Sequence, residues 1–228
     1  MSPFTRYQVA TGIAILFHVV GLAGLLFFKD SGFVNSTPLH LLLMAALLFY
    51  TQSKTGTGLI LFFIICFVTG IVVEIIGTST GRLFGDYQYG TVLGPGFKNV
   101  PWIIGINWFL IIYCCGVAVH SLLSNISQKL SEEMERPVKR IKALSIVIDG
   151  ATLAVAFDWL IEPVAIKLGY WSWLGDGQIP MFNYISWFVI SMLLLLVFHV
   201  LPFPKQNKFA VNLLLIQAMF FLLLRTFL

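Results

Sequence analysis

The sequence predicts an all-α membrane protein, a polytopic helix bundle of about seven transmembrane helices that forms a single transmembrane domain over residues 1–228. Hydrophobic residues make up 58% of the chain and charged residues 11%, which is too apolar for one water-soluble core of this length. The apolar residues also gather in blocks of about twenty, the number that a helix needs to cross about 30 Å of hydrocarbon. We expect helices because lipid offers no partner to unpaired backbone groups.

The predicted spans follow from these blocks in chain order. The second block is short, so we expect it either to be tilted or to cross incompletely. No cleavable signal peptide is expected, because the first apolar stretch is too long for a signal-peptide core and no clear cleavage site follows it. The predicted spans are residues 9–28, 38–52, 58–77, 100–120, 143–161, 181–201 and 209–227.

The basic residues of the short loops predict the orientation, since cytoplasmic loops are enriched in Lys and Arg. With seven spans, the amino terminus is predicted to be cytoplasmic and the carboxyl terminus to lie outside, in a multi-pass protein of the cell (inner) membrane. If the second span fails to cross, both termini change their predicted sides. The predicted inner side holds Arg6, Lys54, Lys129, Arg136, Lys139, Arg140, Lys142, Lys205 and Lys208, and the outer side holds Lys29, Arg82, Lys98, Lys167 and Arg225.

The excess of basic residues on the predicted inner side accounts for most of the net charge of +4, so nucleic acid is not an expected partner.

Two connections on the predicted outer side, residues 78–99 and 162–183, are rich in Gly and aromatic residues. Such residues either anchor a protein at the headgroup level and form turns, or contribute to a functional site. The residues alone leave both interpretations open. The connection 124–142 mixes acidic and basic residues and is interpreted as a solvated cytoplasmic segment.

Acidic residues inside the predicted spans are the strongest functional signal. A charge at the bilayer centre costs at least about 2.5 kcal/mol, so such a residue is a functional candidate by default. Asp158 and Glu162 stand four residues apart and should share one helix face. Glu162 precedes Pro163, where a helix is expected to end, and Glu74 could form a structural ion pair with Arg82. Asp149 is interpreted as structural or interfacial.

The chemistry of such a group depends on its surroundings. Apolar surroundings disfavour the charged form of a carboxyl group, and a protonated carboxylic acid can donate its proton while a neighbouring carboxylate acts as base. This suits acid–base chemistry on an apolar substrate, and it suits proton-coupled transport equally well. The four His residues occur one to a segment without ligand spacing, so no metal site is expected. No nucleotide-binding glycine motif is present.

Three motifs resemble those of one family. EIIGTSTGRLFGDYQYGTVLGPGFKNVPWIIGINW, at residues 74–108, resembles the membrane carotenoid biosynthesis proteins that include the carotenoid 1',2'-hydratases. FDWLIEPVAIKLGYWSW, at 157–173, and GQIPMFNYISWF, at 177–188, resemble the second and third motifs of that family. The resemblance implies an enzyme that adds water to the terminal double bond of an acyclic carotenoid end group, giving a tertiary alcohol without a metal or organic cofactor. The resemblance implies that a lipid bilayer surrounds the protein, and it is compatible with association with other carotenoid-pathway enzymes.

Hydration of a trisubstituted alkene begins with protonation, and water then captures the tertiary carbocation. We expect Asp158 or Glu74 to protonate the alkene, with its partner or Glu162 activating the water. Asp86 is a second candidate for the water side. Aromatic faces stabilise a cation by about 0.5 to 2 kcal/mol each. The expected substrate-binding residues are Trp108, Trp159, Trp171, Trp173 and Trp187 as aromatic walls, Asn107 and Asn183 as hydrogen-bonding amides, and Arg82 and Tyr87.

Two other functions remain open at this stage. A cyclase or isomerase of a carotenoid end group would share the protonation step and differ only in how the cation is quenched. A proton-coupled transporter or a lipid-binding membrane protein would also place carboxyl groups within helices. Inverted repeats between the two halves would favour transport, and none is evident in the sequence.

Overall fold

The computed structural model describes residues 5–28, 32–130 and 135–228, without the side chains of 125–141. Seven helices in this part of the chain are long and apolar enough to cross a membrane, which confirms the predicted all-α bundle. Of the basic residues used to predict orientation, Lys29 and the side chains of Lys129, Arg136, Lys139 and Arg140 lie outside the description. The helices are α1 (Arg6–Phe27), α2 (Thr37–Thr51), α3 (Thr57–Thr80), α4 (Ile103–Leu130), α5 (Glu135–Lys167), α6 (Met181–Val200) and α7 (Lys208–Phe227).

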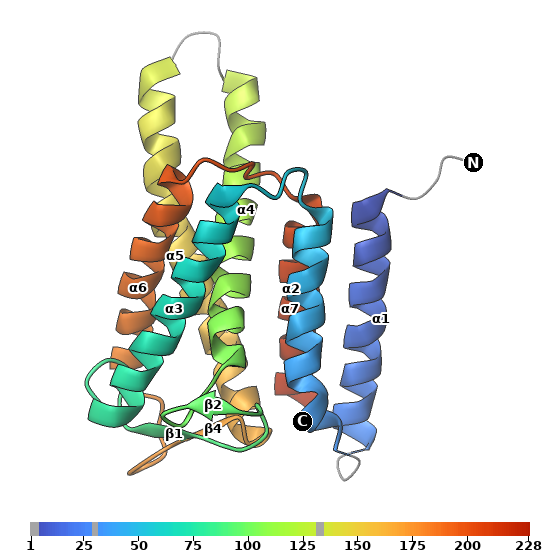
Figure 1. The fold of residues 1–228 in the computed structure, drawn as a ribbon, viewed down its shortest axis with the longest axis vertical. Coiled ribbons are helices and arrows are strands. Elements are labelled where there is room, and N and C mark those ends of the chain that lie inside the picture. Colours follow the sequence, from blue (N-terminus) through green and yellow to red (C-terminus); the bar gives the residue numbers. More distant parts are fainter. Residues whose placement is uncertain (1–4, 29–31, 131–134) are drawn as a thin grey trace.

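The helices run along one common direction, and α1 begins at the end of the bundle opposite to the one where α7 finishes (Figure 1). An odd number of spans requires this arrangement. The second span is complete in length, because the 3-10 helix η2 (Phe33–Ser36) leads directly into α2 and the two together reach 19 residues. Which end of the bundle faces the cytoplasm stays a prediction.

Four short strands lie together at the end of the bundle where α3 and α7 finish (Figure 1). They are β1 (Tyr87–Tyr89), β2 (Gly96–Phe97), β3 (Val100–Pro101) and β4 (Trp171–Trp173). The strand β2 pairs with its neighbour β3, whereas β1 pairs with β4 from the distant α5–α6 connection. The two Gly-rich and aromatic connections therefore meet at one end of the bundle.

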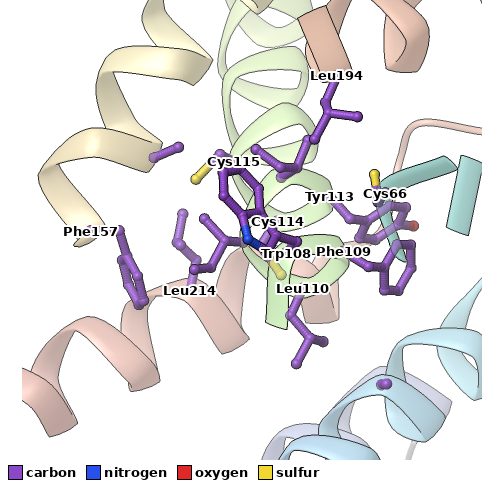
Figure 2. Close-up of a cluster of buried hydrophobic side chains, with 14 of the residues drawn as sticks. Cys66, Trp108, Phe109, Leu110, Tyr113, Cys114, Cys115, Phe157, Leu194 and Leu214 are labelled. Atoms are coloured by element: carbon purple, nitrogen blue, oxygen red, sulfur yellow. The ribbon is translucent and has the colours of Figure 1, made fainter. Parts of the chain in front are cut away.

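Helix α4 forms the centre of the bundle and packs against α2, α3, α5, α6 and α7. Figure 2 shows the cluster around its middle, where Trp108, Tyr113 and Cys114 meet side chains from the neighbouring helices. Because lipid is as apolar as these side chains, close packing rather than water exclusion holds such a bundle together. The three cysteines, Cys66, Cys114 and Cys115, are buried free thiols.

A buried polar network ties the end of α2 to the connection between α6 and α7. The Tyr113 hydroxyl donates to Gln52 Oε1 at 2.6 Å, and Gln52 Nε2 donates to the carbonyl oxygen of Pro204 at 2.6 Å. Asn207 caps α7 by accepting from the backbone N–H of Phe209 at 3.0 Å. Its amide nitrogen points back to Gln52 Oε1 at 3.3 Å. Every member is hydrogen-bonded, so this network fixes the register of the helices it joins.

The prediction that a helix would end near Pro163 is wrong, since α5 continues through Pro163 to Lys167. Proline lacks an N–H and cannot donate to the carbonyl oxygen four residues earlier, that of Trp159. Arg225 of α7 supplies the missing donor, with Nη1 at 2.9 Å from this oxygen. Its guanidinium also lies 3.8 Å from the centre of the Trp159 ring. A partner from another helix thus keeps Glu162 helical and in phase with Asp158.

We predict a coupling between Arg225 and Pro163. Arg225→Leu should lower the free energy of unfolding by about 1–3 kcal/mol, because the Trp159 carbonyl loses its partner inside the membrane. In a Pro163→Ala background the restored N–H bonds to that carbonyl, so the same change should cost less. A double-mutant cycle of unfolding in detergent measures the coupling. Arg82→Leu, at an exposed arginine, serves as control, and equal costs for Arg225→Leu in both backgrounds would contradict the explanation.

Candidate active site

The two Gly-rich and aromatic connections form an aromatic cap over the ends of α3 and α5. Strand β1 runs antiparallel to β4, with Tyr87 opposite Trp173 and Tyr89 opposite Trp171. Side chains alternate along a strand, so these four aromatic residues share one face of the two-stranded sheet. The ring centres lie 5.3 Å apart in the Tyr87–Trp173 pair and 6.1 Å apart in the Tyr89–Trp171 pair. Their polar ends point toward acidic residues in the bundle.

Glu74 of α3 is buried, with 5% of its surface exposed, and accepts hydrogen bonds from three neutral donors. Its Oε2 accepts from the hydroxyl of Tyr89 at 2.7 Å and from that of Tyr87. Its Oε1 accepts from Trp108 Nε1 at 3.0 Å. Gly70, one turn earlier on α3, lies against the Trp108 ring, where any larger residue would displace the indole. A small residue on α3 thus allows α4 to supply a donor.

Glu162 and Asp158 lie together on α5, as their spacing predicted. Glu162 Oε2 accepts from the indole nitrogens of Trp171 at 3.0 Å and Trp173 at 3.1 Å. The Asn183 amide, from α6, donates to Asp158 Oδ2 at 2.9 Å and more weakly to Glu162 Oε1 at 3.4 Å. One amide therefore bridges the two carboxyl groups.

The three acids differ in the donors they receive. Glu74 and Glu162 each accept from three donor groups, whereas Asp158 accepts from one. An ionised carboxylate only accepts hydrogen bonds, while a protonated carboxylic acid also carries a donor. Asp158 Oδ1 has no donor among the described residues, so Asp158 has a free oxygen that can carry a proton. The hydrogen bonds thus distinguish Asp158, which can carry a proton, from Glu74 and Glu162, whose oxygens accept hydrogen bonds from several donors.

These acids line a common chamber. Trp108 and Trp187 form one wall, with ring centres 3.9 Å apart and planes 6° from parallel. Asn107 lines the chamber without a hydrogen bond to any described residue. Stacked indole faces and a free amide beside carboxyl groups can hold a short-lived cation and a polar molecule such as water.

The two tyrosines of the cap act as donors only. Burial raises the pKa of Tyr87 and of Tyr89 far above the usual range, and the nearby Glu74 raises both further. Their hydroxyl groups therefore stay protonated in the physiological pH range. A tyrosine in this state can orient Glu74 by hydrogen bonding but cannot serve as the base.

The chamber brings together ten of the residues that the sequence singled out, namely Glu74, Tyr87, Asn107, Trp108, Asp158, Glu162, Trp171, Trp173, Asn183 and Trp187. It does not include Asp86, Arg82 or Trp159. Asp86 and Arg82 are exposed in the connection after α3, where the Asp86 carbonyl oxygen accepts from the Leu174 N–H at 2.8 Å. Trp159 is 53% exposed beneath Arg225. The possible Glu74–Arg82 ion pair does not form, because nearer neutral donors occupy the Glu74 oxygens.

Sequence reasoning missed three chamber residues, Phe84, Tyr89 and Ile104. A signal for Tyr89 was present in the segments Tyr-Gln-Tyr and Trp-Ser-Trp, since aromatic residues two positions apart are typical of a strand. Reading both segments as strands would have placed Tyr89 and Tyr87 on the same face. Phe84 and Ile104 carry no comparable signal.

Residues 36–228 match the family described as carotenoid biosynthesis protein. The chain belongs to this carotenoid biosynthesis family. The match covers every residue that lines the chamber and extends to both sides of the three motifs. A bisanhydrobacterioruberin hydratase of Haloarcula japonica is 24% identical over 112 residues, which is 47% of this chain and 38% of that protein. The match thus spans well under half of the relative's length. No solved structure matches the chain.

We predict that Asn183 stabilises the acidic pair of this family member. Asn183→Leu should lower the free energy of unfolding by about 1–3 kcal/mol, because two buried carboxyl groups lose their shared donor. Unfolding in detergent measures the change, with Gln178→Leu, at an exposed amide just before α6, as control. An Asn183→Leu variant as stable as the control would show that the bridging amide contributes nothing.

Proposed function

We propose that this protein is a hydratase that adds water to the terminal carbon–carbon double bond of an acyclic carotenoid end group, giving a tertiary alcohol by acid–base catalysis. The observation that carries the proposal is the chamber in which three buried carboxyl groups with unequal hydrogen bonding meet stacked indoles. Membership of the carotenoid biosynthesis family supports a carotenoid substrate, and the printed name of the Haloarcula japonica relative supports hydration.

In this proposal Asp158 is the acid. It receives one hydrogen bond, from Asn183, and its other oxygen is free to hold a proton toward the chamber. Transfer of this proton to the less substituted carbon of the trisubstituted alkene forms a C–H bond there and leaves a tertiary carbocation at the terminal carbon, with Asp158 as a carboxylate. The step needs no oxidant or reductant, since only a proton moves.

The chamber stabilises the cation by charge and by aromatic faces. Glu74 is held as an acceptor by three donors, so its negative charge acts from α3 on the cation that forms near α5. The stacked Trp108 and Trp187 rings add cation–π attraction of about 0.5 to 2 kcal/mol each. Preorganised charge of this kind lowers the barrier because it requires no rearrangement during the reaction.

Glu162 is the base for the water step. Glu162 stands one helical turn from Asp158, which supports its assignment as the base, and the free amide of Asn107 can orient the attacking water. Water forms the C–O bond and gives its proton to Glu162. Return of this proton to Asp158, which shares the Asn183 amide with Glu162, restores the starting state. The product is the tertiary alcohol.

The test is pigment analysis in cells that make an acyclic carotenoid. The unmodified protein should yield a product heavier by one water, and Asp158→Asn should lower its formation at least about 100-fold, the range of general acid catalysis. Glu162→Gln and Glu74→Gln should also lower it. Asp149→Asn, which changes an exposed carboxyl group on the same helix, should keep the full yield.

Two results would contradict this mechanism. A normally expressed Asp158→Asn variant that gives the full yield of hydrated carotenoid would show that Asp158 is not the proton donor. A product of altered retention but unchanged mass would identify cyclisation or isomerisation in place of hydration.

A further inference from the structure

A second chamber adjoins the catalytic chamber. It lies between α1, α2, α4, α5 and α7. Ile104, Asn107 and Trp171 line both chambers, so they form the boundary between the two. An elongated molecule that lies with one end beside Asp158 can continue past this boundary into the second chamber.

The walls of the second chamber select an uncharged ligand. Most of the lining is apolar, including Leu25, Leu41, Phe157 and Phe220. Within the described part of the chain, no Asp, Glu, Lys or Arg side chain lines it. A phosphate or carboxylate buried there would have no compensating charge, which is costly in an apolar site. The chamber therefore fits a neutral hydrocarbon chain better than an isoprenyl diphosphate or a fatty acid anion.

Several polar side chains interrupt this apolar lining, and Gln217, His18 and His40 each have at least one hydrogen-bonding atom without a partner among the described residues. Gln217 of α7 is only 7% exposed, and its amide makes no hydrogen bond with any described residue. His18 of α1 is 5% exposed, and its Nδ1 lies 2.7 Å from the carbonyl oxygen of Ala14, to which it donates. The other ring nitrogen, Nε2, is then an acceptor in the neutral imidazole. The His40 ring of α2 packs edge-on against it, with centres 4.4 Å apart.

Buried polar groups are nearly always hydrogen-bonded, so this unpartnered set calls for a ligand. A hydroxyl group complements it, since the oxygen can accept from the Gln217 amide while the O–H donates to a histidine nitrogen. A hydrocarbon would leave the Gln217 amide and the free histidine nitrogens without a hydrogen-bond partner.

We propose that the second chamber binds the part of an isoprenoid chain that carries a hydroxyl group, with Gln217 and the His18–His40 pair as its hydrogen-bonding partners. The protein thereby prefers oxygenated acyclic isoprenoids to the corresponding hydrocarbons. The assignment of the reacting end to the catalytic chamber rests on the proposed function, whereas the hydroxyl preference can be measured without turnover.

The experiment measures binding as thermal stabilisation of the full chain in detergent. Unfolding is followed with a thiol-reactive dye, because all three cysteines are buried in the folded protein. The ligands are farnesol and geraniol, each compared with the hydrocarbon of the same skeleton that lacks the hydroxyl. A ligand that binds the folded state raises the unfolding temperature, and at a given concentration the increase is larger for a tighter ligand. We expect each alcohol to bind at least about fivefold more tightly than its hydrocarbon.

Matched variants locate this preference. Gln217→Leu should abolish it while leaving hydrocarbon binding unchanged, and His40→Leu, at a less buried position, should reduce it. Gln178→Leu, at an exposed glutamine, should retain it. Equal binding of alcohol and hydrocarbon by the unmodified protein would overturn the proposal, as would a preference that survives in both Gln217→Leu and His40→Leu.

The same measurement separates this proposal from the proposed function. An alcohol preference in a protein that yields no hydrated carotenoid would leave the second chamber assigned and remove the hydratase reaction. Hydrated carotenoid from a protein without the alcohol preference would support the hydratase reaction and overturn the assignment of the second chamber.

Discussion

The structure depends on how three acidic side chains are accommodated among apolar helices. Glu74, Asp158 and Glu162 are each 5% exposed or less, and in the described residues none of them forms an ion pair. Neutral donors take that place, namely phenol, indole and amide groups. A cationic partner would fix the acids as carboxylates and cancel their charge, whereas neutral donors hydrogen-bond their oxygens without supplying a countercharge. Asp158 can therefore carry a proton, as the proposed mechanism requires.

Most of these donors come from the two Gly-rich and aromatic connections, so the cap and the acids are mutually dependent. Tyr87 and Tyr89 belong to β1, and Trp171 and Trp173 belong to β4. The pairing of the two strands aims all four side chains into the bundle, and removal of either strand would leave a buried carboxyl group short of partners. The composition that suggests interfacial anchoring, rich in Tyr, Trp and Gly, here serves the interior.

The helices could be predicted from sequence because membrane spanning depends on local composition. Every predicted span corresponds to a helix, and the shared face of Asp158 and Glu162 follows from helix periodicity. The errors arose where distant residues decide the outcome. The end of α5 depends on Arg225, more than sixty residues away, and the partners of Glu74 come from a strand and from α4 rather than from the adjacent Arg82. The second chamber depends on how α1, α2 and α7 pack, which no local pattern encodes.

The order of donors along the chain has a consequence for biogenesis. Glu74 precedes Tyr87, Tyr89 and Trp108, and Glu162 precedes Trp171, Trp173 and Asn183. Each acid-bearing helix is therefore translated before the segments that supply its donors. Final packing of the acids has to wait for those later segments, and until then each acid lacks its native partners in lipid.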